Sequence, residues 1–375
     1  MVNLKTFLWY LTIGPITLVQ AHPGHDVQTE ARERAAVLKN KRGLGHCADT
    51  FSARGFELKN AVRRDLAVQQ IRREKASTGA PNLVDRDLAS LNTTHHSSLD
   101  VNFQTDPEVL FASNATCILG PDVTQGPYYV SGELIRENVI EDQPGVPLYL
   151  DIQLIDSSTC EPVPSSFVEI WHCNSTGVYS GVVANGNGNY DDSTNINKTF
   201  LRGIQQTDKD GIIKFQTIFP GHYTGRTTHI HVLSHALNDT VRLPNDTVSG
   251  LYTSHASHVG QIFFDQDLIT KVESTIPYSS NTQNLTENSD DSILLEEADD
   301  IDPFVEYVYI NDDEVADGVF GWIALAIDTS EDSSITPAAY LTSSGGISNP
   351  NSGSGGGGGQ PPSGTTSSLS TASST

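Results

Sequence analysis

Two histidines with the spacing of a metal site, His229 and His231, stand in the second half of the chain. Successive side chains of a β-strand point to opposite faces, so a strand here would place both imidazoles on one face. Two imidazoles on one face can bind the same metal ion. An isolated pair of this kind is more often an exposed strand edge. Here, however, Tyr223 and Arg226 lie a few residues upstream, close enough to join the histidines.

A second tyrosine-bearing stretch comes about 50 residues earlier and contains Tyr179. It reads W-H-C-N-S-T-G-V-Y-S over residues 171–180. F-L-R-G follows at residues 200–203, then the turn D-K-D-G, and then P-G-H-Y-T-G-R-T-T-H-I-H up to His231. Several spaced motifs in a fixed order are a far more specific signal than one pair of histidines.

This ordered set resembles the intradiol ring-cleavage dioxygenases, in particular their secreted fungal branch, over roughly residues 115–330. The resemblance implies a non-haem Fe(3+) enzyme that cleaves catechols between the two hydroxyls with O2 and forms cis,cis-muconates. It implies four iron ligands, with Tyr223 leaving the metal when catechol binds. Two phenolates supply two negative charges, which suit a ferric ion. The implied ligands are Tyr179, Tyr223, His229 and His231.

The resemblance also implies residues that act on the substrate. Arg226 matches an active-site arginine suited to stabilising negative charge. Gln261 matches a glutamine on the following strand, although it stands here in G-Q-I-F instead of the commoner T-Q-x-Y. The segment G-P-Y-Y resembles one that lines the mouth of the site, but Tyr128 and Tyr129 are equally suited to fill the core. The interval from Tyr223 to the histidines is short beside the family's bacterial members, so the choice of catechol stays open.

Alternation of apolar and polar residues predicts a mainly β fold. Short strand-like segments separated by turn residues, without intervening helical patterns, are typical of a β-sandwich. We expect the acidic run at residues 290–302 to be a solvated loop. The strand-like segments cover residues 148–154, 168–172, 212–218, 229–233, 260–264, 304–310 and 319–327.

The N-terminal part has a different character. Helix-forming residues predict helices over residues 28–41 and 56–76. We expect the basic residues of these helices to lie on a solvated face. A polar connector at residues 77–110 follows. The second helix carries a loose apolar stripe at Phe56, Leu58, Val62, Leu66 and Ile71.

These patterns divide the chain into four parts. Residues 1–21 have the basic start, apolar run and small-residue cleavage site of a secretory signal, so we expect an extracellular protein. Seven N-glycosylation sequons agree with secretion. Residues 22–110 form the helical arm and connector, and residues 111–340 the dioxygenase-like sandwich domain. Residues 341–375 are rich in Gly, Ser and Thr, which predicts a disordered tail.

The composition limits the partners. Lys+Arg 22 against Asp+Glu 46 gives a net charge of -24, which argues against nucleic acid and anionic membranes. The expected partners are a small aromatic diol and O2, and a homodimer is left open. Two functions other than an enzyme are also compatible with these patterns: a transthyretin-like binding module without the metal, and a structural protein associated with the cell wall.

Four cysteines in an oxidising compartment predict two disulfides. Cys160 and Cys173 lie at opposite ends of a predicted strand, well over ~15 Å apart, whereas a disulfide needs Cα atoms within about 7 Å. Cys117 and Cys173 both lead towards segments of the implied site. We therefore predict the pairs Cys117–Cys173 and Cys47–Cys160, of which the second would fix the N-terminal arm to the sandwich.

Overall fold

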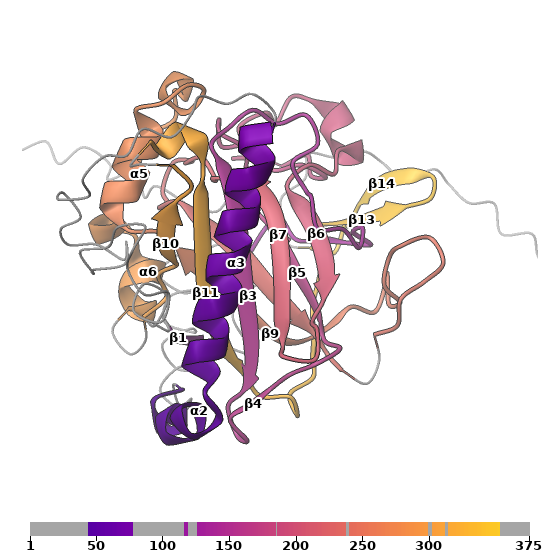
Figure 1. Ribbon diagram of the computed structural model, residues 1–375. Coiled ribbons are helices and arrows are strands. Elements are labelled where there is room, and N and C mark those ends of the chain that lie inside the picture. The colour runs from indigo at the N-terminus through magenta and orange to yellow at the C-terminus, as the bar shows by residue number, and fades with distance from the viewer. Residues whose placement is uncertain are drawn as a thin grey trace, which may run out of the picture.

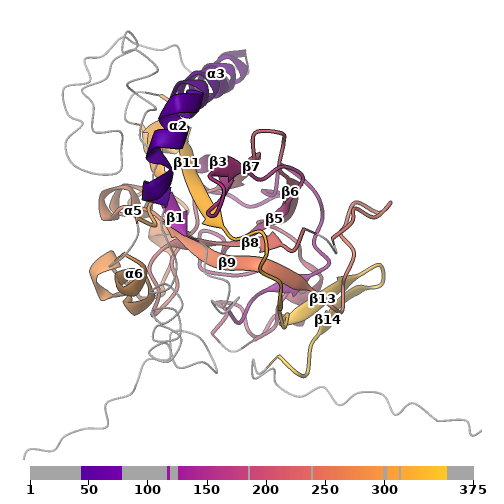
Figure 2. The same ribbon diagram turned by 90° about the horizontal axis from the view of Figure 1, so that it is seen from below.

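The computed structural model describes residues 44–77, 116–118, 126–184, 186–237, 240–298, 302–311 and 314–352. Two β-sheets lie against each other, with helices outside them (Figures 1 and 2). The predicted mainly β sandwich is confirmed. The first sheet has the strand order β1 (Thr116–Ile118), β11 (Val319–Ile327), β3 (Pro147–Asp156), β4 (Glu161–Pro162), with β10 (Glu306–Tyr309) beside β11 and β7 (Ile212–Ile218) beside β3. The second has the order β12 (Ser333–Ser334), β9 (His255–Phe263), β8 (His229–His235), β5 (Phe167–Trp171), β6 (Arg202–Gln206).

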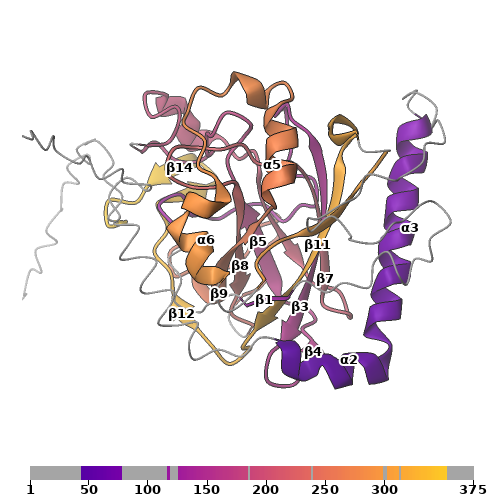
Figure 3. The same ribbon diagram turned by 90° about the vertical axis from the view of Figure 1, so that its left-hand side faces the viewer.

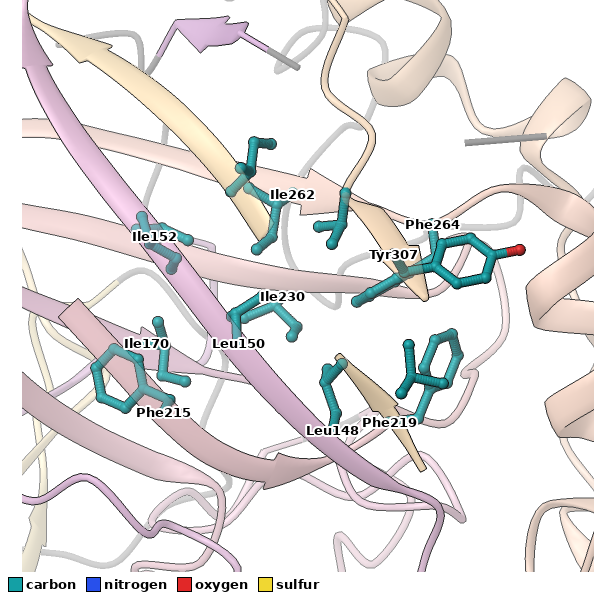
Figure 4. Packing of buried hydrophobic residues seen from close by; sticks show 14 of the residues in the cluster. Leu148, Leu150, Ile152, Ile170, Phe215, Phe219, Ile230, Ile262, Phe264 and Tyr307 are labelled. Carbon is teal, nitrogen blue, oxygen red and sulfur yellow. The ribbon is translucent and has the colours of Figure 1, made fainter. Parts of the chain in front are cut away.

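The core lies between the two sheets and is built by the alternation seen in the sequence. Every second residue of β3 points inward and meets isoleucines from the second sheet (Figure 4). Burial of each such side chain stabilises the fold by about 1.5–3 kcal/mol. The inward residues of β3 are Leu148, Leu150, Ile152 and Leu154, and those facing them include Ile170, Ile230 and Ile262.

Helix α3 (Phe56–Ser77) confirms the second predicted helix, but only Phe56 and Ile71, at the two ends of the predicted apolar stripe, pack against buried clusters. Leu58, Val62 and Leu66 are 46, 44 and 56 % exposed. The helix packs on the outer face of the first sheet (Figures 1 and 3), and that face carries polar groups as well as Trp322. The buried face of the helix matches it with Asn60, Ala61, Arg64 and Val68.

The expectation of a solvated basic face is therefore wrong for two arginines of α3. Arg64 is fully buried, with its guanidinium 5.2 Å from the centre of the Trp322 ring. Arg63 forms an ion pair with Asp151 of β3. Both arginines lie on the side of α3 that faces the sheet, because β3 turns Asp151 and Gln153 towards the helix. Gln153 also accepts a hydrogen bond from Asn60 of the helix (2.8 Å).

One of the two predicted disulfides forms. Cys47–Cys160 is present with a Cα–Cα distance of 5.5 Å and joins the helical arm to the turn after β3. The predicted pair Cys117–Cys173 is wrong, because Cys173 is a buried free thiol that donates to the carbonyl of Gly221 (3.2 Å). Cys117 lies in β1 of the first sheet, whereas Cys173 follows β5 of the second. As expected, Cys160 and Cys173 do not pair.

Several other elements differ from the expectations. The acidic run at residues 290–302 is not simply a solvated loop, because Asp291 is buried and begins helix α6 (Ser292–Glu297). Helix α5 (Gln266–Glu273) interrupts the strands. The expected tail begins with a hairpin of β13 (Ala339–Thr342) and β14 (Gly345–Ser348), which pairs with β2 (Val130–Ser131). The remaining helices are α2 (Ala48–Arg54), η1 (Leu44–Cys47), η2 (Ser193–Asn197), η3 (Tyr278–Ser280), η4 (Asn288–Asp290) and η5 (Val315–Asp317).

Some expectations fall outside the described residues: the signal segment 1–21, the helix over 28–41, most of the connector and the chain after residue 352. Among the helices that are described, none has the length and apolar character needed to cross a membrane.

Candidate metal centre

Four strands of the second sheet place one side chain each in a row on the face turned away from the core. The register pairs Trp171 with Arg202 on one side and with His231 on the other, and pairs His231 with Gln261. Directly opposed residues of antiparallel strands project to the same face. His229 lies two residues before His231 on β8 and therefore joins this face. The two histidines thus lie as the alternation predicts.

Two tyrosines from loops complete a group of four donors around His229. Its Nε2 lies 3.3 Å from Tyr223 Oη, 3.4 Å from Tyr179 Oη and 3.2 Å from His231 Nε2. The Nδ1 atom of His229 lies 2.6 Å from the carbonyl oxygen of Thr227, so Nδ1 carries the proton and donates it to this oxygen. The lone pair of Nε2 therefore points at the ligand atoms of the other three residues. The structure thus brings together all four predicted ligands, and their role as ligands stays a prediction.

The chemistry of this donor set fits a hard, highly charged cation. Burial raises the pKa of both phenols, Tyr179 and Tyr223, well above the ordinary value. Buried phenolates therefore need a positive ion beside them, and oxygen and imidazole donors without a thiolate or carboxylate suit Fe(3+). We infer that these four residues would hold such an ion.

Aromatic rings enclose the four candidate ligands, both on the side of the second sheet and on the side of the loops that carry the two tyrosines. The ring of Trp171 stacks on His231 with centres 4.8 Å apart and planes 5° apart, and Tyr128 stacks on Tyr179 at 4.6 Å. Tyr128 and Tyr129 are both buried, and Tyr128 Oη has no hydrogen-bond partner among the described residues. Gly126 approaches closely, since a Cβ there would lie 3.1 Å from His231 Cε1. The G-P-Y-Y segment therefore both fills space and borders the centre.

Arg226 and Gln261 lie together beside the donors, as their predicted roles require. Both are fully buried, and Arg226 Nη2 donates to Gln261 Oε1. Gln261 Nε2 finds no partner within the described parts of the chain, so it is a donor available to a bound molecule. On its other side Arg226 Nε donates to Asp291 Oδ2 at 2.8 Å.

Asp291 contacts Arg226 at the candidate site and is not among the residues expected from the sequence. Burial alone would raise its pKa, but the Arg226 guanidinium and hydrogen bonds from the backbone of Thr227 and Leu294 hold the pKa below the ordinary value. The carboxylate is thus charged beside the arginine. A signal existed, because an aspartate directly before Ser-Ile-Leu-Leu is typical of a helix N-cap.

The segment around Asp291 also supports the loop that carries Tyr223. Residues 281–291 lie along residues 222–227 and bond to several of them, so a stretch some 60 residues later in the chain fixes this loop. The bonds are Asn281 Nδ2 to His222 O (2.8 Å), Gly225 N to Thr286 Oγ1 (3.0 Å), Thr227 Oγ1 to Asn288 Oδ1 (2.5 Å) and Thr227 N to Asp291 Oδ2 (2.8 Å).

Part of the chain is similar to known dioxygenases. A family model described as "Dioxygenase" matches residues 118–297. Catechol 1,2-dioxygenase 1 of Acinetobacter lwoffii is 31% identical over 109 residues, and catechol 1,2-dioxygenase of Acinetobacter baylyi is 30% identical over 131 residues. The alignments cover 28% and 33% of this chain and 32% and 38% of those proteins, so the match spans about a third of their length.

Among solved structures, an intradiol ring-cleavage dioxygenase from Tetranychus urticae is 30% identical, with 58% of this chain and 98% of that chain covered and a TM-score of 0.46. The chain belongs to the intradiol ring-cleavage dioxygenase family. This family typically uses non-haem Fe(3+), in agreement with the donor set described above.

Proposed function

We propose that this protein is an Fe(3+) dioxygenase that cleaves catechol-type aromatics between their two hydroxyls, consuming one O2 and forming a cis,cis-muconate. The observation that carries the proposal is the convergence of two phenols and two imidazoles on one buried point, His229 Nε2. Both oxygen atoms of O2 enter the product, so no external reductant is needed.

When bound, the ferric ion would act as a Lewis acid and make the ring of the bound diol reactive towards O2. Tyr179, Tyr223, His229 and His231 would hold it. Tyr223 would be the ligand that gives way to the diol, and its Oη would accept a hydroxyl proton of the diol.

Two side chains are proposed to act on the substrate directly. The Arg226 guanidinium, held by Asp291, stabilises negative charge that develops on the ring and on the attacking oxygen. The Gln261 Nε2 amide donates a hydrogen bond to an oxygen of the reacting group. Because both residues are fully buried, they act in a site from which bulk water is excluded.

The proposal is tested by loading the protein with Fe(3+) and measuring colour, iron content and O2 consumption with catechol. Bound tyrosinate should give a visible absorption band, and the product should show the ultraviolet absorption of a conjugated diene diacid. Tyr179→Phe and His231→Ala should each lose iron or the visible band. A protein that stays colourless and iron-free after reconstitution would support the transthyretin-like binding module instead.

We also propose that the protein is secreted. The Cys47–Cys160 disulfide supports an oxidising compartment. In a secretory host, glycans should then appear on the exposed sequon residues Asn197, Asn245 and Asn284. Asn174 should stay unmodified, because its Nδ2 donates to Gln143 Oε1 at 2.9 Å and its Oδ1 accepts backbone hydrogen bonds. Mass spectrometry of glycopeptides checks this pattern, and a protein retained in the cytoplasm with free Cys47 would contradict secretion.

A further inference from the structure

Tyr179 lies in the long connection between β5 and β6, outside any strand. Its backbone N–H and C=O therefore lack the ladder of hydrogen bonds that holds His229 and His231 in β8. A metal ligand nevertheless has to be held within about 0.5 Å of its productive position. The contacts of the Tyr179 backbone show what replaces the strand.

Two buried asparagines hold this backbone directly. Asn187 Oδ1 accepts from Tyr179 N at 2.8 Å, and Asn187 Nδ2 donates to Tyr179 O at 2.8 Å. Asn195 Nδ2 donates to the same carbonyl at 2.8 Å and to Val182 O at 2.7 Å. The two side chains are 2 % and 1 % exposed, so water does not compete for these bonds.

Arg202, the arginine of the F-L-R-G motif, holds the next residue along the chain. Its Nη2 donates to Ser180 O at 2.7 Å and to Tyr128 O at 2.7 Å, and its Nε donates to Ser180 O and Oγ at 3.0 Å. Tyr128 is the residue whose ring stacks on Tyr179. One rigid guanidinium thus joins β6 to both segments that border the phenol, in the planar geometry that only arginine supplies.

We propose that Asn187, Asn195 and Arg202 are positioning residues that together fix the phenol of Tyr179 at the candidate metal centre. This inference rests on the proposed function, because it concerns how tightly the same four donors hold a ferric ion. The three side chains replace a β-ladder around a loop residue. Loss of one of them lets the backbone of Tyr179 shift, and residues that orient a ligand typically change metal affinity by about 10–100-fold.

The test compares Asn187→Ala with Asn349→Ala. Asn349 is an equally suited control, because it is buried at 7 % exposure and holds a loop backbone through Pro337 O at 2.8 Å, but in the C-terminal hairpin region. We measure Fe(3+) and Ga(3+) affinity by competition with a chelator, and the melting temperature of the metal-free proteins. Asn187→Ala should bind both ions at least about 10-fold more weakly and shift the visible band of the ferric form. Asn349→Ala should leave ion affinity and band unchanged.

Hydrogen exchange of the Tyr179 amide in the metal-free protein gives a readout that needs no ion. It should accelerate in Asn187→Ala and not in Asn349→Ala. If the unaltered chain takes up no ferric ion, the proposed function fails, while the exchange result still reports whether the asparagine holds this backbone.

The inference itself is overturned if folded Asn187→Ala keeps the unaltered ion affinity and absorption band. If Asn187→Ala does not fold, Asn187→Asp takes its place, since it keeps the acceptor for Tyr179 N and removes the donor to Tyr179 O. Arg202→Lys provides the parallel comparison, with the equally buried Arg64→Lys as its control. Equal ion affinities in these two lysine variants would overturn the role of Arg202.

Discussion

Replacing Asp291 by asparagine removes the negative charge beside Arg226 while it keeps the size and shape of the side chain. Asp291 Oδ2 accepts from Arg226 Nε and from Thr227 N, both at 2.8 Å. Its Oδ1 accepts from Ile293 N at 2.9 Å and Leu294 N at 3.1 Å and so caps α6. Asparagine has a single acceptor oxygen, so one of these two sets of donors must lose its partner.

The size of the effect follows from burial. Both ends of the pair are fully buried, and breaking a buried ion pair by removing one partner costs about 3–5 kcal/mol, because the remaining charge is left without compensation. We therefore expect Asp291→Asn to lower the free energy of unfolding by at least about 3 kcal/mol. Displacement of the guanidinium from the site should also lower turnover, on the order of 10²-fold.

Urea unfolding and O2 consumption with catechol measure the two effects. Asp265→Asn is the control, because Asp265 also caps a helix, α5, by accepting from Leu268 N at 2.8 Å, whereas the ion pair of Arg226 described above is with Asp291. Loss of a cap alone costs about 1 kcal/mol. If Asp291→Asn costs no more than Asp265→Asn and turns over at the unaltered rate, then Asp291 does not position Arg226 and the reasoning is refuted.

Three further outcomes are expected. Arg226→Ala should keep iron and its visible band but lose turnover on the order of 10²-fold, because it removes charge stabilisation without removing a ligand; equal loss of iron would show that its role is misassigned. Cys47→Ser opens a covalent link across 113 residues and should lower the free energy of unfolding by roughly 2–5 kcal/mol in urea titrations; unchanged stability would contradict this. Burial raises the pKa of Glu133 to about 8 in the folded chain, whereas its pKa in the unfolded chain is about 4.3. Between these two pH values the folded chain keeps a proton that the unfolded chain releases. Stability should therefore fall as pH rises through this window, by at most about 1.4 kcal/mol per pH unit, and urea unfolding at pH 5 and pH 8 should show that Glu133→Gln removes this slope.

The sequence predicts most reliably what local patterns decide. Alternation placed β3 and the His229–His231 face correctly, because the direction of a side chain in a strand depends only on its position along that strand. The buried face of α3 was not predictable in this way. An apolar stripe would pack on an apolar surface, but the sheet beneath α3 presents Asp151 and Gln153, which select Arg63 and Asn60. That choice depends on one strand, β3, whose two residues lie 88 and 93 residues further along the chain than their partners.

The same distinction separates the donors of the candidate site from the residues that hold them. The candidate metal ligands lie in short sequence motifs, because two ligands on one strand must be two residues apart to share a face. Their supports are polar loop residues whose partners are backbone groups, and no periodicity marks these. Between residues 183 and 197 the chain contains several asparagines, of which Asn187 and Asn195 are buried against Tyr179 while Asn197 is exposed. Residue type alone does not separate them, because the difference is set by which amide reaches an unpaired backbone group. A loop that carries a metal ligand and is rich in asparagine should therefore be examined for side chains that replace a strand.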